Sequence, residues 1–267
     1  MRFSKLYKSI LCAVAVFAAS GYSASASDDL YKEIMKAGKI KVATDLAIPP
    51  SGMLDENLQP VGSDVETAKL LAKDWGLELE FVKVTAESRI PTLLTKKADI
   101  LISTLAITDE RKKVVDFTMP YAAIVSVIGA PANSDIKSWD DVRGKEVTVT
   151  RGVAQDAMVT KMAAEKGITV VRYSDDATMV TAALSGQAKI VASSASIVQA
   201  IGKRDAALSF EPKFSIGSLP LGLGVRKDEP ELLAKLNEWV AANRKNGNLN
   251  DIYKKFHGAD LPAELQQ

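Results

Sequence analysis

Arg111 is the residue of this sequence whose type and position best suit the binding of a small anion. It follows a short apolar run, residues 100–102, which predicts a buried strand that ends in the hydroxyl residues Ser103 and Thr104. Open α/β sheets bind small molecules just outside the carboxyl ends of their strands. A guanidinium group there presents two donors that match a carboxylate. For a lone arginine, a salt bridge with a neighbour such as Glu110 is the ordinary alternative.

Gly152 lies in a second segment that could bind the same anion. It follows a predicted strand, residues 146–150, and Val153 and Ala154 then lead into a predicted helix. The N-terminus of that helix would direct free backbone N–H groups and a favourable dipole at a cleft. One carboxylate could then be held from both sides, by Arg111 and by this backbone. An ordinary strand-to-helix turn explains Gly152 equally well.

The composition excludes several other kinds of site. The chain has 267 residues, of which 47% are hydrophobic and 25% charged, as is typical of a soluble globular protein. One histidine, His257, and one cysteine, Cys12, are too few for a metal-ligand cluster or a Cys-His nucleophile. The sequence has no phosphate-binding loop motif and no basic block of the kind that binds nucleic acid. We therefore expect no cofactor, no metal and no nucleic-acid partner.

The N-terminus has the pattern of a secretory signal peptide. Three basic residues precede an apolar run from Ile10 to Ala19, and small residues follow as far as Ala26. The run is too short to span a bilayer. Cleavage after Ala26 would remove Cys12 and three cations, which changes the formal net charge from +1 to −2. We expect an exported, soluble protein without disulfide bonds.

Two blocks of alternating strand and helix patterns predict an α/β protein with two similar lobes. Gly38 is expected to end the first helix, Ser63 to cap the second, and Thr108 to cap a short turn. Two coincident α/β stretches in one sheet are the alternative interpretation. The first block has helices at 30–38, 63–75 and 88–97 and strands at 39–44, 77–84 and 99–103; the second has strands at 146–150, 167–173 and 189–193 and helices at 154–166 and 176–185.

Two strand-like connectors, residues 122–131 and 217–225, would join the lobes. Helices predicted at 229–244 and 248–256 are then most simply packed back on the first lobe. A chain that crosses twice between lobes forms a hinge, which suits closure around a ligand. The expected divisions are a signal peptide at 1–26, lobe 1 at 27–124 and 219–267, and lobe 2 at 125–218.

Several spaced motifs resemble those of one protein family. Residues 103–111 (STLAITDER) followed by 115–117 (VDF), together with 60–66 (PVGSDVE) and 89–91 (RIP), are similar to motifs of the polar amino-acid-binding family of bacterial periplasmic solute-binding proteins. The likeness runs from about Lys39 to Gly258. It implies the two-lobe periplasmic binding protein fold, in which each lobe is a mostly parallel sheet flanked by helices and a two-strand hinge joins the lobes.

The resemblance also implies a function, because members of this family are the capture subunits of ABC importers. We expect a periplasmic binding protein, not an enzyme, that captures a small amino acid or related carboxylate and delivers it to an inner-membrane ABC permease by lobe closure. A monomer suits a protein that docks both lobe tips on a permease. Two alternatives stay open: a periplasmic dehydratase-type enzyme on the same fold (cyclohexadienyl dehydratase-like), with Asp45 as its acid, and a ligand-sensing partner of a chemoreceptor.

By resemblance, Arg111 binds the α-carboxylate of the ligand. Three expected site residues depart from the family pattern: Ile48 stands where an aromatic residue is usual, and Ala106 and Val153 where hydroxyl residues are usual. The full set of expected ligand-binding residues is Arg111, Ser103, Thr104, Asp45, Ile48, Ala106, Gly152, Val153, Ala154 and Ser194.

Ser194 is the most consequential departure. In the family an acid usually stands at this position and receives the α-ammonium group of the ligand, whereas a serine offers no opposite charge. Burying an ammonium group without a counter-charge is costly. Either Asp45 or Asp156 supplies the missing charge, or the ligand is a carboxylate without an α-ammonium group.

Overall fold

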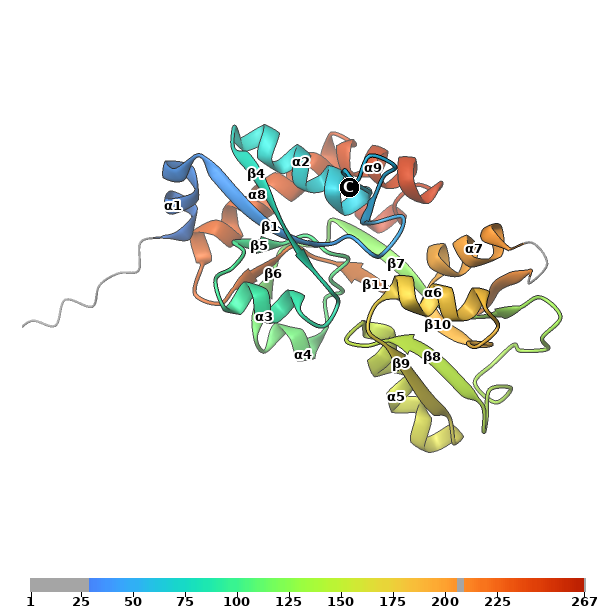
Figure 1. Cartoon of the computed structure of the whole chain (residues 1–267). Helices are drawn as coiled ribbons and strands as arrows, with labels where there is room; N and C mark the ends of the chain where they lie inside the picture. The colour runs from blue at the N-terminus through green and yellow to red at the C-terminus, as the bar shows by residue number, and fades with distance from the viewer. Residues whose placement is uncertain (1–28, 206–208, 267) are drawn as a thin grey trace, which may run out of the picture.

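The computed structural model describes residues 29–205 and 209–266, and the predicted signal peptide, with Cys12, lies outside them. Two separate five-stranded sheets, each with its own helices, form two lobes (Figure 1). The α/β class predicted from the sequence is confirmed, and the two repeated blocks lie in different sheets rather than in one. Within the described part of the chain, every helix is too short or too polar to cross a bilayer.

The first lobe is built on a sheet with the strand order β4-β1-β5-β12-β6. Strands β4, β1 and β5 are parallel, whereas β12 is antiparallel to both β5 and β6. The sheet is therefore mixed, because the chain returns from the second lobe to add β12 in the opposite direction. The strands are β1 (Lys39–Asp45), β4 (Glu78–Val84), β5 (Ile100–Leu101), β6 (Val115–Phe117) and β12 (Gly224–Arg226).

Helices cover both faces of this sheet: α2, α8 and α9 lie on one side, and α3 and α4 on the other (Figure 1). The C-terminal helices pack on the first lobe as predicted, since Leu232 and Trp239 of α8 share a buried cluster with Ile40 of β1. The helices are α1 (Leu30–Ala37), α2 (Ser63–Trp75), α3 (Arg89–Leu94), α4 (Asp109–Lys112), α8 (Pro230–Lys245), α9 (Asn248–His257) and the 3-10 helix η1 (Ala263–Leu265), beside a hairpin of β2 (Met53–Leu54) and β3 (Pro60–Val61).

Local sequence signals explain the helix ends near the cleft. Gly38 ends α1 in the left-handed conformation, and the Thr108 hydroxyl caps α4 by accepting from the backbone N–H of Arg111 at 3.3 Å; both were predicted. Ser63 does not cap α2 as predicted but is its first residue, and Gly62 precedes it with φ 132°. A Cβ atom at Gly62 would lie 2.3 Å from the carbonyl oxygen of Ser51, so only glycine fits there.

The second lobe is built on a sheet with the order β11-β7-β10-β8-β9, in which β10, β8 and β9 are parallel and β7 is antiparallel to both of its neighbours, β10 and β11. Helix α7 was not predicted; the other helices were. The elements are β7 (Ala122–Pro131), β8 (Glu146–Thr150), α5 (Ala154–Lys166), β9 (Thr169–Tyr173), α6 (Asp176–Leu184), β10 (Val191–Ser194), α7 (Ala195–Arg204) and β11 (Phe210–Leu221).

Strands β7 and β11 carry the chain between the lobes. They pair antiparallel from Ala122 with Leu221 to Pro131 with Phe210. Ala122 and Leu221 belong to the core of the first lobe, whereas Phe210 belongs to a core of the second. The two crossings predicted from the sequence are therefore present as one continuous ribbon.

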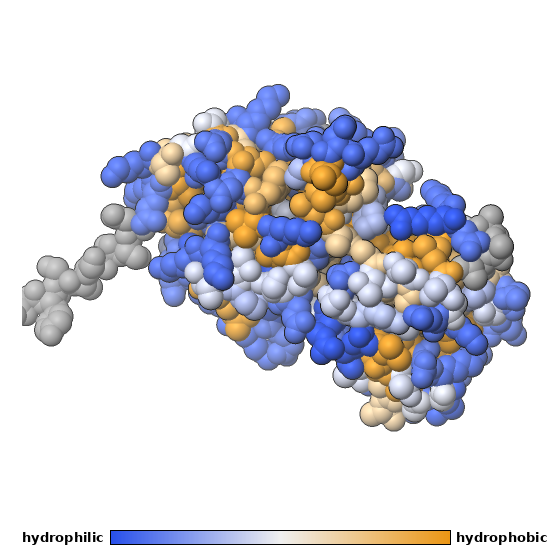
Figure 2. Space-filling model, in the orientation of Figure 1, coloured by the Kyte–Doolittle hydropathy of each residue, from blue (hydrophilic) through white to orange (hydrophobic). Residues whose placement is uncertain are grey.

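The face of the molecule that is turned to the viewer in Figure 1 is mostly hydrophilic. Figure 2 shows it in the same orientation, with hydrophobic side chains in separate patches on both lobes.

Candidate functional site

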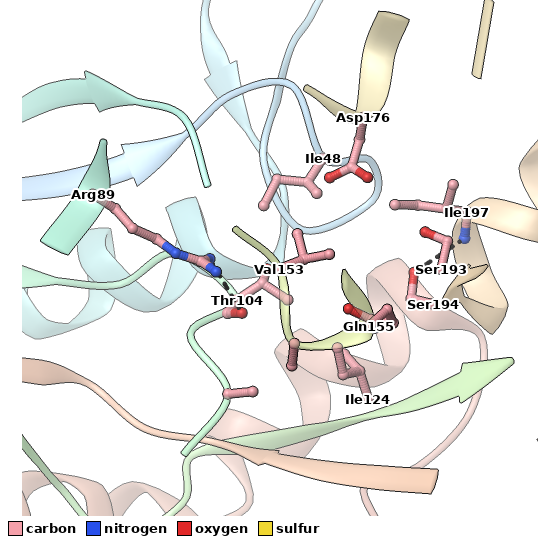
Figure 3. Close-up of a pocket in the computed structure, with 12 residues that line it drawn as sticks. Ile48, Arg89, Thr104, Ile124, Val153, Gln155, Asp176, Ser193, Ser194 and Ile197 are labelled. Atoms are coloured by element: carbon pink, nitrogen blue, oxygen red, sulfur yellow. Dashed lines mark hydrogen bonds between the residues drawn. The ribbon is translucent and has the colours of Figure 1, made fainter. Parts of the chain in front are cut away.

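A cavity lies between the lobes, where the carboxyl ends of their parallel strands face each other (Figure 3). The unfilled space at this cavity amounts to about 400 Å³, part of which is open to solvent. Both apolar and polar side chains line it. The first lobe contributes Ile48, Arg89, Thr104 and Ala106, strand β7 contributes Ile124, and the second lobe contributes Val153, Ala154, Gln155, Asp176, Ser193, Ser194 and Ile197.

Arg89 is the cation in the lining of this cavity. It is the first residue of α3 and is only 2% exposed. Its Nη1 atom donates to the carbonyl oxygens of Ser103 at 2.5 Å and Thr104 at 3.4 Å, and its buried Nε atom has no partner among the described residues. Burial lowers the pKa of Arg89, against the opposing effect of nearby carboxylates. The guanidinium group is thus fixed by backbone oxygens, and no carboxylate of the described residues is bonded to it.

Asp176 is the acid in the lining, and it comes from the other lobe. It is the first residue of α6, is 5% exposed, and accepts a hydrogen bond at Oδ1 from the Thr150 hydroxyl at 2.6 Å. Its Oδ2 atom has no donor among the residues that the structure describes. Burial raises the pKa of Asp176 to about 6, and the hydrogen bond from Thr150 opposes this rise. Figure 3 shows Arg89 and Asp176 pointing into the cavity from different sides.

Thr104 has an uncommon backbone conformation, with φ 45°. Its hydroxyl donates to Asp64 Oδ2 at 2.6 Å, and Asp64 Oδ1 accepts from the Tyr121 hydroxyl at 2.6 Å. Burial raises the pKa of Asp64, while the two hydroxyl donors favour its charged form. Residues held in the left-handed region cost of order 1–3 kcal/mol and persist where the surroundings fix them. The hydrogen bonds through Asp64 therefore fix the turn after β5 beside the cavity.

Arg111 does not line this cavity but bridges the lobes next to it. Its Nη1 atom donates to the carbonyl oxygen of Ala106 at 2.8 Å, and its Nη2 atom donates to that of Gly152 at 2.9 Å. Arg111, Gly152, Val153 and Ala154 all line a second, more open pocket between α4 and α5. Burial, together with the nearby positive charge of Arg89, lowers the pKa of Arg111 to about 9. Two guanidinium groups thus lie close enough to repel each other.

The lobes touch at Gly152. This residue has φ 79°, and a Cβ atom on it would lie 3.1 Å from the Cα atom of Glu87 in the first lobe. Beside it, Arg151 Nε lies 3.9 Å from Glu87 Oε2. A glycine is needed here for its backbone conformation and for the close approach of the other lobe.

Six of the ten site residues expected from the sequence line the cavity. The other four, Ser103, Arg111, Gly152 and Asp45, do not. Ser103 is fully buried behind it, where its hydroxyl accepts from the backbone N–H of Asp45 at 3.1 Å. Arg111 and Gly152 lie at the second pocket, as described above. The six that line the cavity are Ile48, Thr104, Ala106, Val153, Ala154 and Ser194.

The two acids considered as replacements for the missing charge both have other partners. Asp45 is 2% exposed and does not line the cavity; its Oδ1 atom accepts from the backbone N–H of Ala47 at 2.9 Å. Asp156 forms an ion pair with Arg172 at 2.9 Å and accepts from the backbone N–H of Gly152 at 3.3 Å. Ser194 itself is the N-cap of α7, where its hydroxyl accepts from the N–H of Ile197 at 3.3 Å.

Arg89, Gln155 and Asp176 line the cavity but were not selected from the sequence. Arg89 was noted only as part of the 89–91 motif, and Asp176 only as a helix start. A signal for both existed: each follows the carboxyl end of a parallel strand, β4 or β9, as Arg111 follows β5. Gln155 is held by a hydrogen bond to Ser126 at 2.9 Å, a contact between α5 and β7 that no sequence spacing indicates.

The arrangement suits the binding of a small polar molecule by electrostatics and hydrogen bonds. Arg89 and Asp176 offer opposite charges from opposite lobes, and Ile48, Val153 and Ile197 supply apolar walls. No group of three or more potential metal ligands occurs within residues 29–205 and 209–266. A cavity between two hinged lobes binds most strongly a molecule that contacts both of them.

Known proteins are similar over most of the chain. A family model described as "Bacterial extracellular solute-binding proteins, family 3" matches residues 40–259. The histidine-binding periplasmic protein of Salmonella typhimurium is 30% identical over 84% of this chain and 89% of its own. The L-cystine-binding protein TcyJ of Escherichia coli is 27% identical over 93% of this chain and 94% of its own. The crystal structure of the ancestral amino acid-binding protein AncCDT-1, a precursor of cyclohexadienyl dehydratase, is 32% identical with a TM-score of 0.75, covering 84% of this chain and 97% of that one.

Proposed function

Because this chain belongs to the bacterial extracellular solute-binding proteins of family 3, we propose that it captures a small amino acid or related carboxylate and delivers it to an ABC import permease. Its relatives include periplasmic proteins named for the binding of histidine and of L-cystine, which supports an amino-acid ligand in the periplasm. The two relatives are named for different ligands, so the family alone leaves the compound open. Export by cleavage after Ala26 and a monomeric state are parts of the same proposal.

One observation carries the proposal: two guanidinium groups lie at the gap between the lobes, Arg89 in the lining of the cavity and Arg111 in the bridge beside it. Arg89 lines the cavity, and its charge is close enough to lower the pKa of Arg111. An anion between them would offset their repulsion. The Arg111 donors now bound to Ala106 and Gly152 could turn to such a group, because a charged acceptor forms a stronger hydrogen bond than a carbonyl. The α-carboxylate of an amino acid fits this position.

In this mechanism, binding and closure are the same event. The lobes, which we place at residues 27–124 with 219–267 and at 125–218, rotate about β7 and β11. The ligand then contacts Arg89 and Thr104 from one side and the N-terminus of α5 from the other. The permease would recognise the surface formed by both lobe tips when they are closed.

A thermal-shift screen tests the proposal. Purified protein without the first 26 residues is heated with the amino acids, their deaminated carboxylic acids, polyamines and simple organic acids. A compound at a hundred times its Kd adds about 2.7 kcal/mol to the stability, which is readily seen. Each hit is confirmed by isothermal titration calorimetry, and X-ray scattering should show a smaller radius of gyration on binding. If no compound in the panel binds, the proposed capture of an amino acid or carboxylate is wrong.

A dehydratase-type enzyme is the second candidate. AncCDT-1 is a precursor of such an enzyme but is itself an amino acid-binding protein, so the observation that supports this candidate is the buried carboxylate of Asp176 in the cavity lining, whose pKa burial raises to about 6. Incubation with prephenate and with arogenate, followed by chromatography, distinguishes the candidates. A binding protein returns each compound unchanged. Turnover that Asp176→Asn removes would establish the enzyme instead.

A further inference from the structure

We propose that Asp176 is the counter-charge for a positively charged nitrogen group of the ligand, either its α-ammonium group or a cationic side chain. This inference rests on the proposed capture function and names the group that the cavity recognises. It assigns to Asp176 the role that Ser194 cannot fill, because a serine carries no charge.

The environment of Asp176 leaves one of its carboxylate oxygens available. Asp176 lines the cavity; its Oδ1 atom accepts from Thr150, while its Oδ2 atom has no donor within the described residues. The residue is 5% exposed, so bulk water contributes little to its solvation. A buried carboxylate that lacks a counter-ion is unfavourable, and a cationic group placed in the cavity would relieve this cost.

The charges inside the protein do not already neutralise Asp176. Arg89 lies across the cavity, but no ion pair joins the two residues among the contacts of the described chain, and the Arg89 Nη1 atom is bound to the carbonyl of Ser103. The other nearby charges, Asp45 and Asp175, are negative and raise the pKa of Asp176 further. The potential at Oδ2 therefore favours a cation.

The alternative acids are less suitable. Asp156 is paired with Arg172 and does not line the cavity, and Asp45 lies behind the lining and accepts from Ala47. Asp45 can strengthen the negative potential without touching the ligand. Of the acids considered for this role, Asp176 is the one that reaches the cavity.

The position of Asp176 also links recognition of a positively charged nitrogen group to closure of the lobes. It belongs to the second lobe, whereas Arg89 and Arg111 belong to the first. A molecule with an anionic and a cationic end would make one charged contact with each lobe, so it would hold the lobes together. A simple carboxylate would lack the second contact.

The alternative explanation is that Asp176 serves only the fold, as a partner of Thr150 at the start of α6. Asp175 provides a matched control for this explanation. It is the adjacent residue, it carries the same charge, and it caps the same helix by accepting from the N–H of Thr178 at 2.8 Å, but it does not line the cavity. Asp175→Asn and Asp176→Asn therefore remove the same charge from neighbouring positions of one helix.

The test compares compounds that differ by one charge. Calorimetry measures the Kd of wild type, Asp176→Asn and Asp175→Asn for the proteinogenic amino acids, L-ornithine and L-cystine, each beside its 2-deaminated acid. L-arginine is also compared with L-citrulline, which keeps the shape but loses the side-chain charge. The first pairing reports on an α-ammonium group and the second on a cationic side chain.

We expect wild type to prefer the charged member of one pairing by tenfold or more. Asp176→Asn should reduce that preference to about twofold or less, while Asp175→Asn keeps it. The inference is overturned if wild type binds only compounds without a positive nitrogen, or binds both members of each pair equally, because the capture function then stands without a cation site. It is also overturned if Asp176→Asn keeps the preference. Binding of none of the compounds removes the proposed function and this inference together.

Discussion

Arg111 in the first lobe donates a hydrogen bond from Nη2 to the carbonyl oxygen of Gly152 in the second lobe, over 2.9 Å. The same guanidinium group donates to Ala106 in its own lobe at 2.8 Å. Arg111 therefore links the two lobes directly beside the cavity. A ligand carboxylate bound here would replace a neutral acceptor by a charged one at the point where the lobes meet.

Arg111→Ala should abolish or strongly weaken ligand binding and leave the fold intact. A hydrogen bond to a charged group contributes about 1.5–3 kcal/mol, so the loss corresponds to roughly 10- to 150-fold in Kd. Calorimetry with the best compound of the screen measures the affinity, and circular dichroism checks the fold. Arg151→Ala is the control, because this exposed arginine makes only a 3.9 Å contact with Glu87 and should change Kd by about twofold or less. Unchanged affinity in Arg111→Ala would remove Arg111 from the binding site.

Gly152→Ala should hinder lobe closure in addition to straining the backbone. Alanine with positive φ costs roughly 1–2 kcal/mol, and the new Cβ atom would lie 3.1 Å from Glu87 Cα in the opposite lobe. Gly144→Ala is the matched control, since Gly144 has φ 70° but a Cβ atom added there would meet no described atom within 4 Å apart from its chain neighbours. Both variants should lose similar stability in urea unfolding. Only Gly152→Ala should also weaken ligand binding, by about tenfold, and increase the radius of gyration in the presence of ligand. Equal affinities in the two variants would show that the contact at Gly152 is not part of closure.

Much of the fold could be predicted because its signals are local. The strand Glu146–Thr150, the helix Ala154–Lys166 and the connector Ala122–Pro131 have the predicted bounds, since each is an uninterrupted periodic pattern with a clear end. The mixed direction of the sheets could not be read in the same way. Strand β12 has three residues, Gly224–Arg226, and its antiparallel pairing with β5 depends on where a distant segment of the chain returns.

The candidate site was predicted less completely than the fold, because side-chain direction is a tertiary property. Arg111 follows a strand end, as Arg89 does, yet the 2%-exposed Arg89 lines the cavity and Arg111 bridges the lobes beside it. Ser194 looked like a contact for the ligand, but its position at the start of α7 makes it a helix cap as well. Helix α7 and its cap at Ser194 were missed for the same reason. The apolar run before Ser194 has the pattern of a strand, and no helix was expected directly after it.

Ser194→Ala should destabilise the protein through this cap. Loss of a serine N-cap costs about 1 kcal/mol, because the N–H of Ile197 loses its acceptor. Ser194→Asp keeps an equally good cap, so its stability in urea unfolding should stay near that of wild type. Ser196→Ala is the control, as its hydroxyl contacts only that of Ser194 and caps no backbone group in the described structure. Equal stability of Ser194→Ala and wild type would show that the cap contributes nothing measurable.

Asp176 should make the stability of the ligand-free protein depend on pH. Burial raises its pKa from 3.8 to about 6; the negative charges of Asp45 and Asp175 add to this rise, whereas the hydrogen bond from Thr150 and the positive charge of Arg89 oppose it. The folded state therefore binds this proton more tightly than the unfolded state does. The resulting stabilisation is complete below about pH 4 and is lost as the pH rises through about 6, which corresponds to at most about 3 kcal/mol at pH 7.

Asp176→Asn removes this dependence, so the variant should gain stability relative to wild type when urea unfolding is moved from pH 4 to pH 7. For Asp175→Asn we expect the opposite: stability relative to wild type should fall between pH 4 and pH 7. Despite the partial desolvation of Asp175, hydrogen bonds led by that from the N–H of Thr178 lower its pKa. Its contribution is therefore present at neutral pH and lost in acid, so this variant should be less stable than wild type at pH 7 and should approach it in acid. If the stabilities of wild type and Asp176→Asn change in parallel between pH 4 and pH 7, the charged form of Asp176 does not destabilise the fold.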